Sequence, residues 1–221
     1  MTEILFEDRD YVICKKMPGE ISEESNSAES LPYMLKKQLN SEIYTLHRLD
    51  KPVGGVIVYA KNKKAAAAFS ALITSNRFAK TYLAVTDGIP AEDEGEFTDL
   101  LFKDSRKNKT FVVKKMRKGV KDASLTYTTQ SKTDSKALVK IRLKTGRSHQ
   151  IRVQFASRKM PLAGDGKYGS RDKGARTPSL FAFRLEFPYK GRPCAVCALP
   201  ELEQYPWSLF DRSIYEEQYD R

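Results

Sequence analysis

The sequence is poor in the residues that cross-link small proteins or bind metals. It has three cysteines, Cys14, Cys194 and Cys197, and two histidines, His47 and His149, in 221 residues. An odd number of cysteines in a chain of this length does not indicate a disulfide framework. Cys194 and Cys197 form a lone C-x-x-C pair, whereas a structural zinc site takes four ligands. We therefore predict no metal site, and we interpret the pair as two buried thiols of a strand in a reduced, cytoplasmic protein.

Several other features are absent. No apolar run approaches the length of a membrane span, and the N-terminus has no secretory pattern. The patterns G-x-x-x-x-G-K-[ST], H-E-x-x-H and G-x-S-x-G do not occur. These absences remove the usual support for nucleotide hydrolysis, zinc-dependent proteolysis and serine hydrolysis.

Positive charge is abundant. The chain has 39 Lys and Arg against 28 Asp and Glu, a formal net charge of +11. Such an excess indicates a polyanionic partner, most simply nucleic acid and less often an anionic membrane surface. The plain alternative is a basic protein that is merely soluble. The densest positive stretch is 103–121, which surrounds a short apolar strand.

The periodicity of the chain predicts more strands than helices. Alternating or β-branched stretches predict strands at 10–16, 55–62, 80–88, 124–133, 136–146, 179–189 and 193–200. Helical spacing predicts helices at 31–40, 62–78 (capped by Asn62) and 148–160. Loops are expected at 18–30, 91–96 and 161–170. Because no regular β-α-β rhythm occurs, we predict an α+β fold with a mostly antiparallel or mixed central β-sheet, flanking helices and a single domain over 1–221.

One stretch places charge directly before a buried strand. In HRLDKPVGG, Arg48 and Asp50 precede a proline and the glycine pair Gly54-Gly55, which permit a tight backbone and the close approach of a ligand. A neighbouring arginine keeps a half-buried carboxylate ionised, and such a group acts as a nucleophile or a base. The alternative is a structural Arg–Asp pair at the start of a strand, and this segment alone leaves both open.

A second stretch, 143–170, crowds Arg147, His149 and Arg152 at the start of the third predicted helix. Ser148 is a candidate cap for that helix, whose first amides would favour an anion. Two arginines and a histidine suit a phosphate or carboxylate site better than a core. The alternative is a solvated basic helix.

Together these segments resemble the RluA type of RNA pseudouridine synthase. HRLDKPVGGVIVYAK resembles that family's H-R-L-D motif and the strand that follows it. TGRSHQIRV and PLAGDGKYG resemble its T-G-R-x-H-Q-I-R-V and P-x-x-G-D-x-x-Y-G motifs, and KTYLAV resembles its K-x-Y-x-A-V strand. These segments occur in the family's order and span about 45–170, so the resemblance implies the pseudouridine synthase fold in its short form, without an S4-type RNA-binding domain.

The resemblance also implies roles for single residues. Asp50 takes the position of the nucleophile, Tyr82 packs against the target base, and Arg152 pairs with the catalytic aspartate. Arg48 helps to displace the base, and Ile151 or Val153 walls its pocket. The remaining residues expected to bind RNA or the base are His47, Lys80, Arg147 and His149. The implied reaction uses no cofactor or metal, and the implied partner is rRNA or tRNA, bound by a monomer through 103–121 and 158–176.

Two departures from the family pattern stand out. Val53-Gly54 replaces the family's Thr-Ser or Thr-Thr, and KKMPG replaces its K-P-x-G. Two other functions compete with the resemblance. One is an RNA-binding module without activity, and the other is a glycosidase-like enzyme with Asp165 as its second carboxylate. The sequence does not encode which RNA or which uridine is the target, nor whether Asp50 acts at C1′ or C2′ of the ribose.

Overall fold

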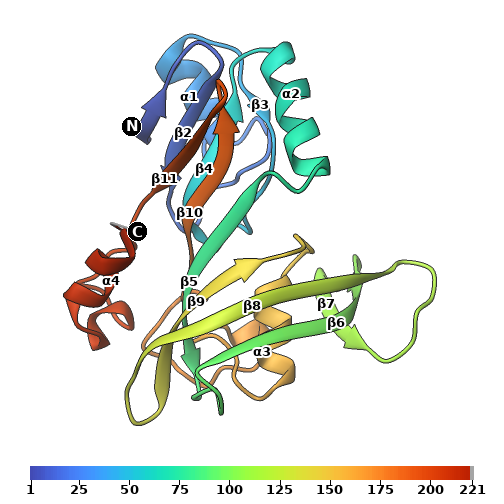
Figure 1. Ribbon diagram of the computed structural model, residues 1–221, viewed down its shortest axis with the longest axis vertical. Helices are drawn as coiled ribbons and strands as arrows, with labels where there is room; N and C mark the ends of the chain where they lie inside the picture. Colours follow the sequence, from blue (N-terminus) through green and yellow to red (C-terminus); the bar gives the residue numbers. More distant parts are fainter. Residues whose placement is uncertain (220–221) are drawn as a thin grey trace. The chain divides into compact units, whose positions relative to one another are not determined.

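The computed structural model describes residues 1–219, which form two compact units (Figure 1). The first unit contains Met1–Lys80 and Phe181–Pro200, and the second contains Thr81–Leu180 with the C-terminal segment from Glu201. Each unit is built around its own β strands. The expectation of a single catalytic domain over 1–221 stays a prediction.

The first unit contains a mixed sheet in the order β1-β2-β4-β10-β11. Its strands are β1 (Glu3–Glu7), β2 (Tyr11–Lys16), β4 (Gly54–Ala60), β10 (Leu180–Tyr189) and β11 (Arg192–Cys197). The short β3 (Tyr44–Thr45) also pairs with β4. The pairs are antiparallel except β4 with β10, which is parallel. Figure 1 shows the orange and red hairpin β10–β11 among the blue and cyan strands of this unit.

The ends of the two helices of the first unit are explained by the residues at their termini. Helix α1 (Leu31–Leu39) has a proline in its first turn, and Asn40 ends it in a left-handed conformation with φ of 46°. Helix α2 (Lys63–Thr74) contains four consecutive alanines. The Asn62 side chain accepts a hydrogen bond from the Ala65 amide at 2.8 Å, which confirms the predicted cap.

The start of β4 requires a glycine. Gly55 has φ of +127°, and a Cβ built on it would lie 2.3 Å from the carbonyl oxygen of Ala182 on β10. All seven residues of β4 are buried. The backbones of β4 and β10 are therefore in direct contact at Gly55 and Ala182, where the chain leaves the Asp50 loop.

The second unit contains an antiparallel sheet in the order β5-β9-β8-β6-β7. Its strands are β5 (Ala79–Asp87), β6 (Glu94–Asp104), β7 (Lys109–Val113), β8 (Val120–Lys132) and β9 (Lys136–Leu143). Helix α3 (Gln150–Ser157) packs against β6 and β7. One apolar cluster of this unit joins Leu101, Ala123, Val153 and Tyr168. The short helical segments are η1 (Gly166–Tyr168), η2 (Trp207–Leu209) and α4 (Arg212–Tyr219).

Most predicted elements are confirmed, including the strands that form the antiparallel pairs β8–β9 and β10–β11. Three predictions are wrong in detail, and one element was missed. Strand β6 begins at Glu94, inside the predicted acidic loop. His149, not Ser148, precedes the first residue of α3 and makes no side-chain cap. Helix α4 was not predicted. Cys194 and Cys197 do lie on β11, but they are half-buried rather than buried.

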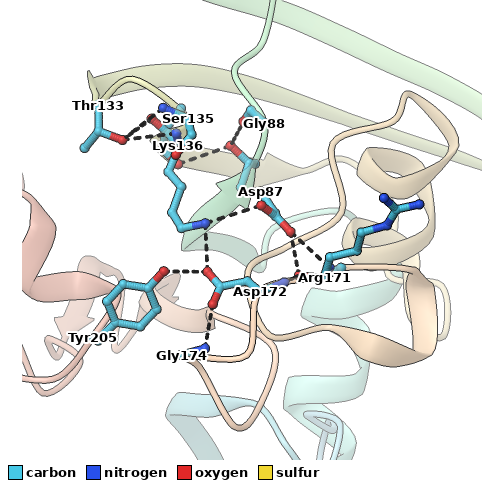
Figure 2. Close-up of polar contacts among 12 residues, drawn as sticks. Asp87, Gly88, Thr133, Ser135, Lys136, Arg171, Asp172, Gly174 and Tyr205 are labelled. Atoms are coloured by element: carbon cyan, nitrogen blue, oxygen red, sulfur yellow. Dashed lines mark hydrogen bonds and ion pairs between the residues drawn. The ribbon is translucent and has the colours of Figure 1, made fainter.

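A polar cluster holds the glycine-rich segment and the C-terminal segment to the β5 and β9 strands (Figure 2). The Lys136 ammonium lies 3.3 Å from Asp87 Oδ1 and 2.7 Å from Asp172 Oδ2. The Tyr205 hydroxyl donates to Asp172 Oδ2 at 2.6 Å, and the Ser170 hydroxyl donates to Asp87 Oδ2 at 2.8 Å. This network fixes one end of the segment that carries Asp165 and Tyr168.

Two kinds of feature are absent from the part of the chain that the structure describes. Among residues 1–219, no helix combines the length and the apolar composition needed to cross a membrane. Within the same residues, His, Cys, Asp and Glu side chains form no group of three or more that could hold a metal ion.

Candidate active site

The residues predicted to act together fall into two groups, one in each unit. The group in the first unit comprises His47, Arg48, Asp50 and Lys80. The group in the second unit comprises Tyr82, Arg147, His149, Ile151 and Arg152. Each group has its own supporting contacts.

Asp50 begins a tight turn whose backbone is held on its N-terminal side. The Asp50 carbonyl accepts a hydrogen bond from the Val53 amide at 2.9 Å. The hydroxyl of the buried Ser22 donates to the Leu49 carbonyl at 2.8 Å and accepts from the Leu49 amide at 3.2 Å. The Asp50 side chain itself is half-buried. Ser22 thus fixes the residue immediately before the carboxylate.

Lys16 holds the other side of the same turn. Its side chain is fully buried, and its ammonium donates to the carbonyls of Val53 at 2.6 Å, Lys51 at 3.0 Å and Met17 at 3.2 Å. Burial lowers the pKa of Lys16 to about 8, although the carboxylates of Glu20 and Asp50 act in the opposite direction. Three carbonyl acceptors thus satisfy the three N–H bonds of the ammonium.

The role of Lys16 was not predicted from the sequence. Its only signal was KKMPG, which aligns imperfectly with the family's K-P-x-G. Because Ser22 and Lys16 bind the backbone on both sides of Asp50, the backbone that carries this carboxylate is held in place before any ligand arrives.

Arg48 lies at the surface and is held loosely. Its guanidinium lies 2.9 Å from Glu23 Oε1, and both side chains are more than half exposed. Exposed ion pairs of this kind contribute about 0–1 kcal/mol. Arg48 can therefore separate from Glu23 at little free-energy cost. Such a low cost is required of a side chain that moves when a ligand binds.

His47 lies against the middle of β4. Its Nε2 accepts a hydrogen bond from the Val58 amide at 3.3 Å, and its ring meets the edge of Phe78 at 5.0 Å between centroids. Burial, followed by the charge of Lys80, places the pKa of His47 well below its usual range, so the ring is neutral. His47 Nδ1 is buried and has no hydrogen-bond partner among residues 1–219. These contacts are with protein, and its predicted contact with RNA stays a prediction.

Lys80 is half-buried beside Phe78, with its ammonium 5.5 Å from the ring centroid. Burial lowers the pKa of Lys80. A cation in this setting favours an anionic ligand, because pairing would offset its desolvation. The RNA-binding role predicted for Lys80 stays a prediction.

In the second unit, Gln150 shapes the TGRSHQ loop. Its Oε1 accepts hydrogen bonds from the Arg147 amide at 3.0 Å and the Thr145 hydroxyl at 2.8 Å, and its Nε2 donates to the Ser124 carbonyl at 3.1 Å. Arg147 Nε donates to the Asp122 carbonyl at 2.7 Å. The direction of the Arg147 guanidinium is therefore set from β8.

Arg152 is buried and bound by a carboxylate from the glycine-rich segment. Its Nε donates to Asp165 Oδ2 at 2.7 Å and its Nη2 to Asp165 Oδ1 at 2.8 Å. Arg152 is 4% exposed and Asp165 1%. The solvated-helix interpretation of this segment is wrong, because every residue from Gln150 to Phe155 is buried. Both oxygens of Asp165 are engaged by the arginine, which leaves it poorly suited to act as a second catalytic acid.

Tyr168 connects this ion pair with His149. The centroid of its ring lies 5.0 Å from the Arg152 guanidinium. Its hydroxyl accepts a hydrogen bond from the Thr110 amide at 2.9 Å and lies 2.8 Å from His149 Nδ1. The motif G-D-x-x-Y-G contained this tyrosine, but nothing in the sequence linked it to a histidine 19 positions earlier.

Tyr82 and Ile151 are both buried, at 6% and 4% exposure. Tyr82 lies on β5 opposite Ile141 of β9, and Ile151 lies in the first turn of α3. The pairing of Arg152 with Asp50 and the packing of Tyr82 against the target base stay predictions.

The profile of the family described as RNA pseudouridylate synthase matches residues 10–157. An uncharacterized RNA pseudouridine synthase of Haemophilus influenzae is 29% identical over 204 residues, which cover 92% of this chain and 89% of that protein. A tRNA pseudouridine synthase C of Vibrio vulnificus is 28% identical, and the alignment covers 96% and 95% of the two chains. The solved structure of human RNA pseudouridylate synthase domain containing 4 has a similar fold, with a TM-score of 0.75, 24% identity and coverage of 90% and 89%.

Proposed function

Because the chain belongs to the RNA pseudouridylate synthase family, we propose that it isomerises specific uridines to pseudouridine in structured tRNA or rRNA. The net charge of +11 supports a polyanionic substrate. The similarity to a tRNA pseudouridine synthase C over nearly the whole of both chains supports tRNA as the first substrate to test. The proposed enzyme works as a monomer in the cytoplasm and needs no cofactor.

The reaction rearranges bonds without changing composition. The N1–C1′ glycosidic bond of uridine breaks, the uracil turns, and a C5–C1′ bond forms. C5 then loses its proton, and N1 ends with a proton in its place. Asp50 acts at the ribose, either by attack on C1′ or by removal of the C2′ proton. Uridine deuterated at C2′ separates the two routes, because only the second breaks that C–H bond.

The other predicted residues prepare the substrate for this step. Arg152 pairs with Asp50 and keeps it ionised, and Tyr82 stacks on the base and assists the late proton transfer from C5. Ile151 contributes an apolar wall to the base pocket. Arg48 enters the space that the base leaves when it is flipped out of the RNA stack, a step that costs a few kcal/mol. His47, Lys80, Arg147 and His149 contribute to the binding of RNA.

The observation that carries the proposal is the anchoring of Asp50 inside the H-R-L-D motif. A nucleophile must be held in position before the substrate binds, and Ser22 and Lys16 fix the backbone on both sides of Asp50. A surface Arg–Asp pair at a strand start would need neither a buried serine nor a buried lysine beneath it. Arg48, moreover, pairs with Glu23.

The proposal is tested with RNA that carries tritium at C5 of uridine, transcribed without modifications. Formation of the C5–C1′ bond expels the label, so release into water reports the reaction itself. We expect release by the wild type and none by Asp50→Asn, which is isosteric but cannot act as a nucleophile. Asp134→Asn, an exposed aspartate of the second unit, is the matched control and should release label at the wild-type rate.

The outcomes separate the competing functions. Binding of RNA without release by the wild type would indicate a binding module. Equal release by the wild type and Asp50→Asn would support the proposed reaction but show that Asp50 is not its catalytic residue. Separate tRNA and rRNA substrates identify the target class, and release in the presence of EDTA and without added nucleotide tests the expected independence from cofactors.

A further inference from the structure

The hydroxyl of Tyr168 lies between a backbone donor and a histidine nitrogen that can accept. The Thr110 amide donates to it at 2.9 Å, and His149 Nδ1 lies 2.8 Å away. Tyr168 is 9% exposed, and all three residues belong to the second unit. A buried hydroxyl in this position must place its own proton on an acceptor.

The donors and acceptors around the phenol limit where its proton can lie. The Thr110 amide can only donate, so it occupies a lone pair of the phenol oxygen. Burial raises the pKa of the Tyr168 hydroxyl, which therefore keeps its proton at neutral pH. Two groups beside the phenol can accept that proton, His149 Nδ1 and the Thr110 hydroxyl, and we assign it to His149 Nδ1. A neutral imidazole that accepts at Nδ1 carries its own proton on Nε2.

The backbone of His149 adds a second restraint. The residue has φ of 53° and ψ of 22°, a left-handed conformation that non-glycine residues adopt infrequently, and its carbonyl accepts from the Val153 amide at 3.0 Å. The ring of Tyr168 meets the imidazole edge to face, with 5.7 Å between centroids and 88° between planes. The direction of the imidazole is thus set both by its own backbone and by Tyr168.

We propose that Tyr168 is a positioning residue of the reaction, whose hydroxyl locks His149 in the Nε2–H tautomer so that His149 donates a hydrogen bond to an oxygen of the bound RNA. The RNA part of this inference rests on the proposed function, whereas the tautomer does not. An Nε2–H donor suits a phosphate oxygen or a base carbonyl, since both only accept.

The two histidines of the chain make the tautomer directly measurable. His47 Nε2 accepts from the Val58 amide, so His47 should carry its proton on Nδ1, the opposite of His149. Long-range ¹H–¹⁵N spectra of protein labelled at histidine should therefore show one residue of each tautomer. His149→Gln assigns the two signals. In Tyr168→Phe we expect His149 to become a mixture of tautomers while His47 is unchanged.

Tyr168→Phe retains the ring beside Arg152 and removes only the hydroxyl, so a loss of activity cannot be assigned to lost packing. We expect kcat/KM for tritium release to fall about tenfold, the equivalent of one hydrogen bond. Tyr168→Phe should add no further loss to His149→Gln, because both changes remove the same interaction. The control is Tyr127→Phe, which removes another tyrosine hydroxyl of the second unit, a half-buried one that donates to the Glu92 carbonyl. It should leave both tautomers and kcat/KM unchanged.

Each result has one meaning. A wild-type His149 protonated on Nδ1, or an unchanged His149 spectrum in Tyr168→Phe, overturns the proposed lock. A changed tautomer with kcat/KM within about twofold of the wild type removes Tyr168 from the reaction. If the wild type releases no label, the proposed function fails while the spectra still decide the tautomer. A lower melting temperature in Tyr168→Phe is corrected for by assaying the folded fraction.

Discussion

Arg152 and Asp165 face each other across two parallel hydrogen bonds, in which two nitrogens of one guanidinium donate to the two oxygens of one carboxylate. Planar, bidentate pairs of this kind fix the direction of an arginine as well as its charge. Asp165 comes from the segment after α3, so Arg152 is oriented from outside its own helix. The orientation of the arginine therefore depends on a residue that the family motif places 13 positions later.

Asp165→Asn should lower the free energy of unfolding by about 3–5 kcal/mol, because it removes the charge of a buried carboxylate from a buried arginine. Urea denaturation followed by tryptophan fluorescence or circular dichroism measures the change. Glu96→Gln breaks the exposed pair of Glu96 with Lys144 in the same unit and should leave the unfolding midpoint unchanged. Equal shifts for the two variants would show that burial of the pair does not matter.

Lys16→Met should change how stability depends on pH. Burial lowers the pKa of Lys16 to about 8 in the folded chain, from an ordinary value of 10.5. Between these two pKa values the unfolded chain holds a proton on Lys16 that the folded chain has lost. The free energy of unfolding of the wild type therefore increases with pH in this range, by at most about 1.4 kcal/mol per pH unit. Below pH 8 the penalty of burying the charge is present in full.

The variant should lack this rise, and at pH 7 it should also lose activity, because the carbonyls of Lys51 and Val53 are left without their donor. Denaturation curves from pH 7 to about 10 provide the measurement. Lys64→Met, on the exposed side of α2, is the control for a lost lysine. A variant whose stability rises with pH as steeply as that of the wild type would rule out Lys16 as the source.

Arg48→Ala should reduce activity in a manner that depends on the structure of the RNA. If Arg48 replaces the flipped base, the loss in kcat/KM should reach tenfold or more on a folded RNA, where unstacking costs a few kcal/mol. It should be much smaller on a short unstructured RNA that contains the same uridine. Glu23→Gln, which frees Arg48 from its surface partner, should change stability by at most about 1 kcal/mol and should not reduce kcat/KM. Equal losses for Arg48→Ala on both RNAs would argue against insertion.

The exposed cations of 103–121 should account for much of the salt dependence of RNA binding. In this segment they are Lys103, Arg106, Lys107, Lys114, Lys115, Arg117, Lys118 and Lys121. Replacing Lys114, Lys115 and Lys118 by alanine should lower the slope of log affinity against log salt by about 2, at 0.7–0.9 for each lost phosphate contact. Fluorescence anisotropy at about 50 to 200 mM salt measures this slope. The triple alanine variant of Lys37, Lys63 and Lys64 removes the same charge from the first unit. If both triple variants lowered the slope equally, the salt dependence would reflect the net charge of the protein and not the segment 103–121.

Local sequence patterns correctly predicted those strands and helix caps that are determined by residues close together in the chain. The β-branched run of β4 and the Asn62 cap of α2 follow from residues within a few positions of one another. The Lys16 contacts could not be predicted this way, because they join residues 35 and 37 positions apart, and a lysine in a basic sequence is expected at the surface. The Ser148 cap failed for a related reason. The Thr110 hydroxyl of β7 donates to the Ser148 carbonyl, and α3 starts one residue later than predicted.

The division of the chain between its two units has a consequence for synthesis on the ribosome. The strands of the second unit follow one another within Thr81–Leu180, whereas the first unit needs β10 and β11, which are translated after that stretch. Until Phe181 and Ala182 have emerged, the glycine edge of β4 behind Asp50 has no parallel neighbour. The nascent chain therefore finishes the strands around Arg152 and Tyr168 first and the support of Asp50 last. A polypeptide that stops short of β10 would carry every predicted site residue and still leave the Asp50 strand with an open edge.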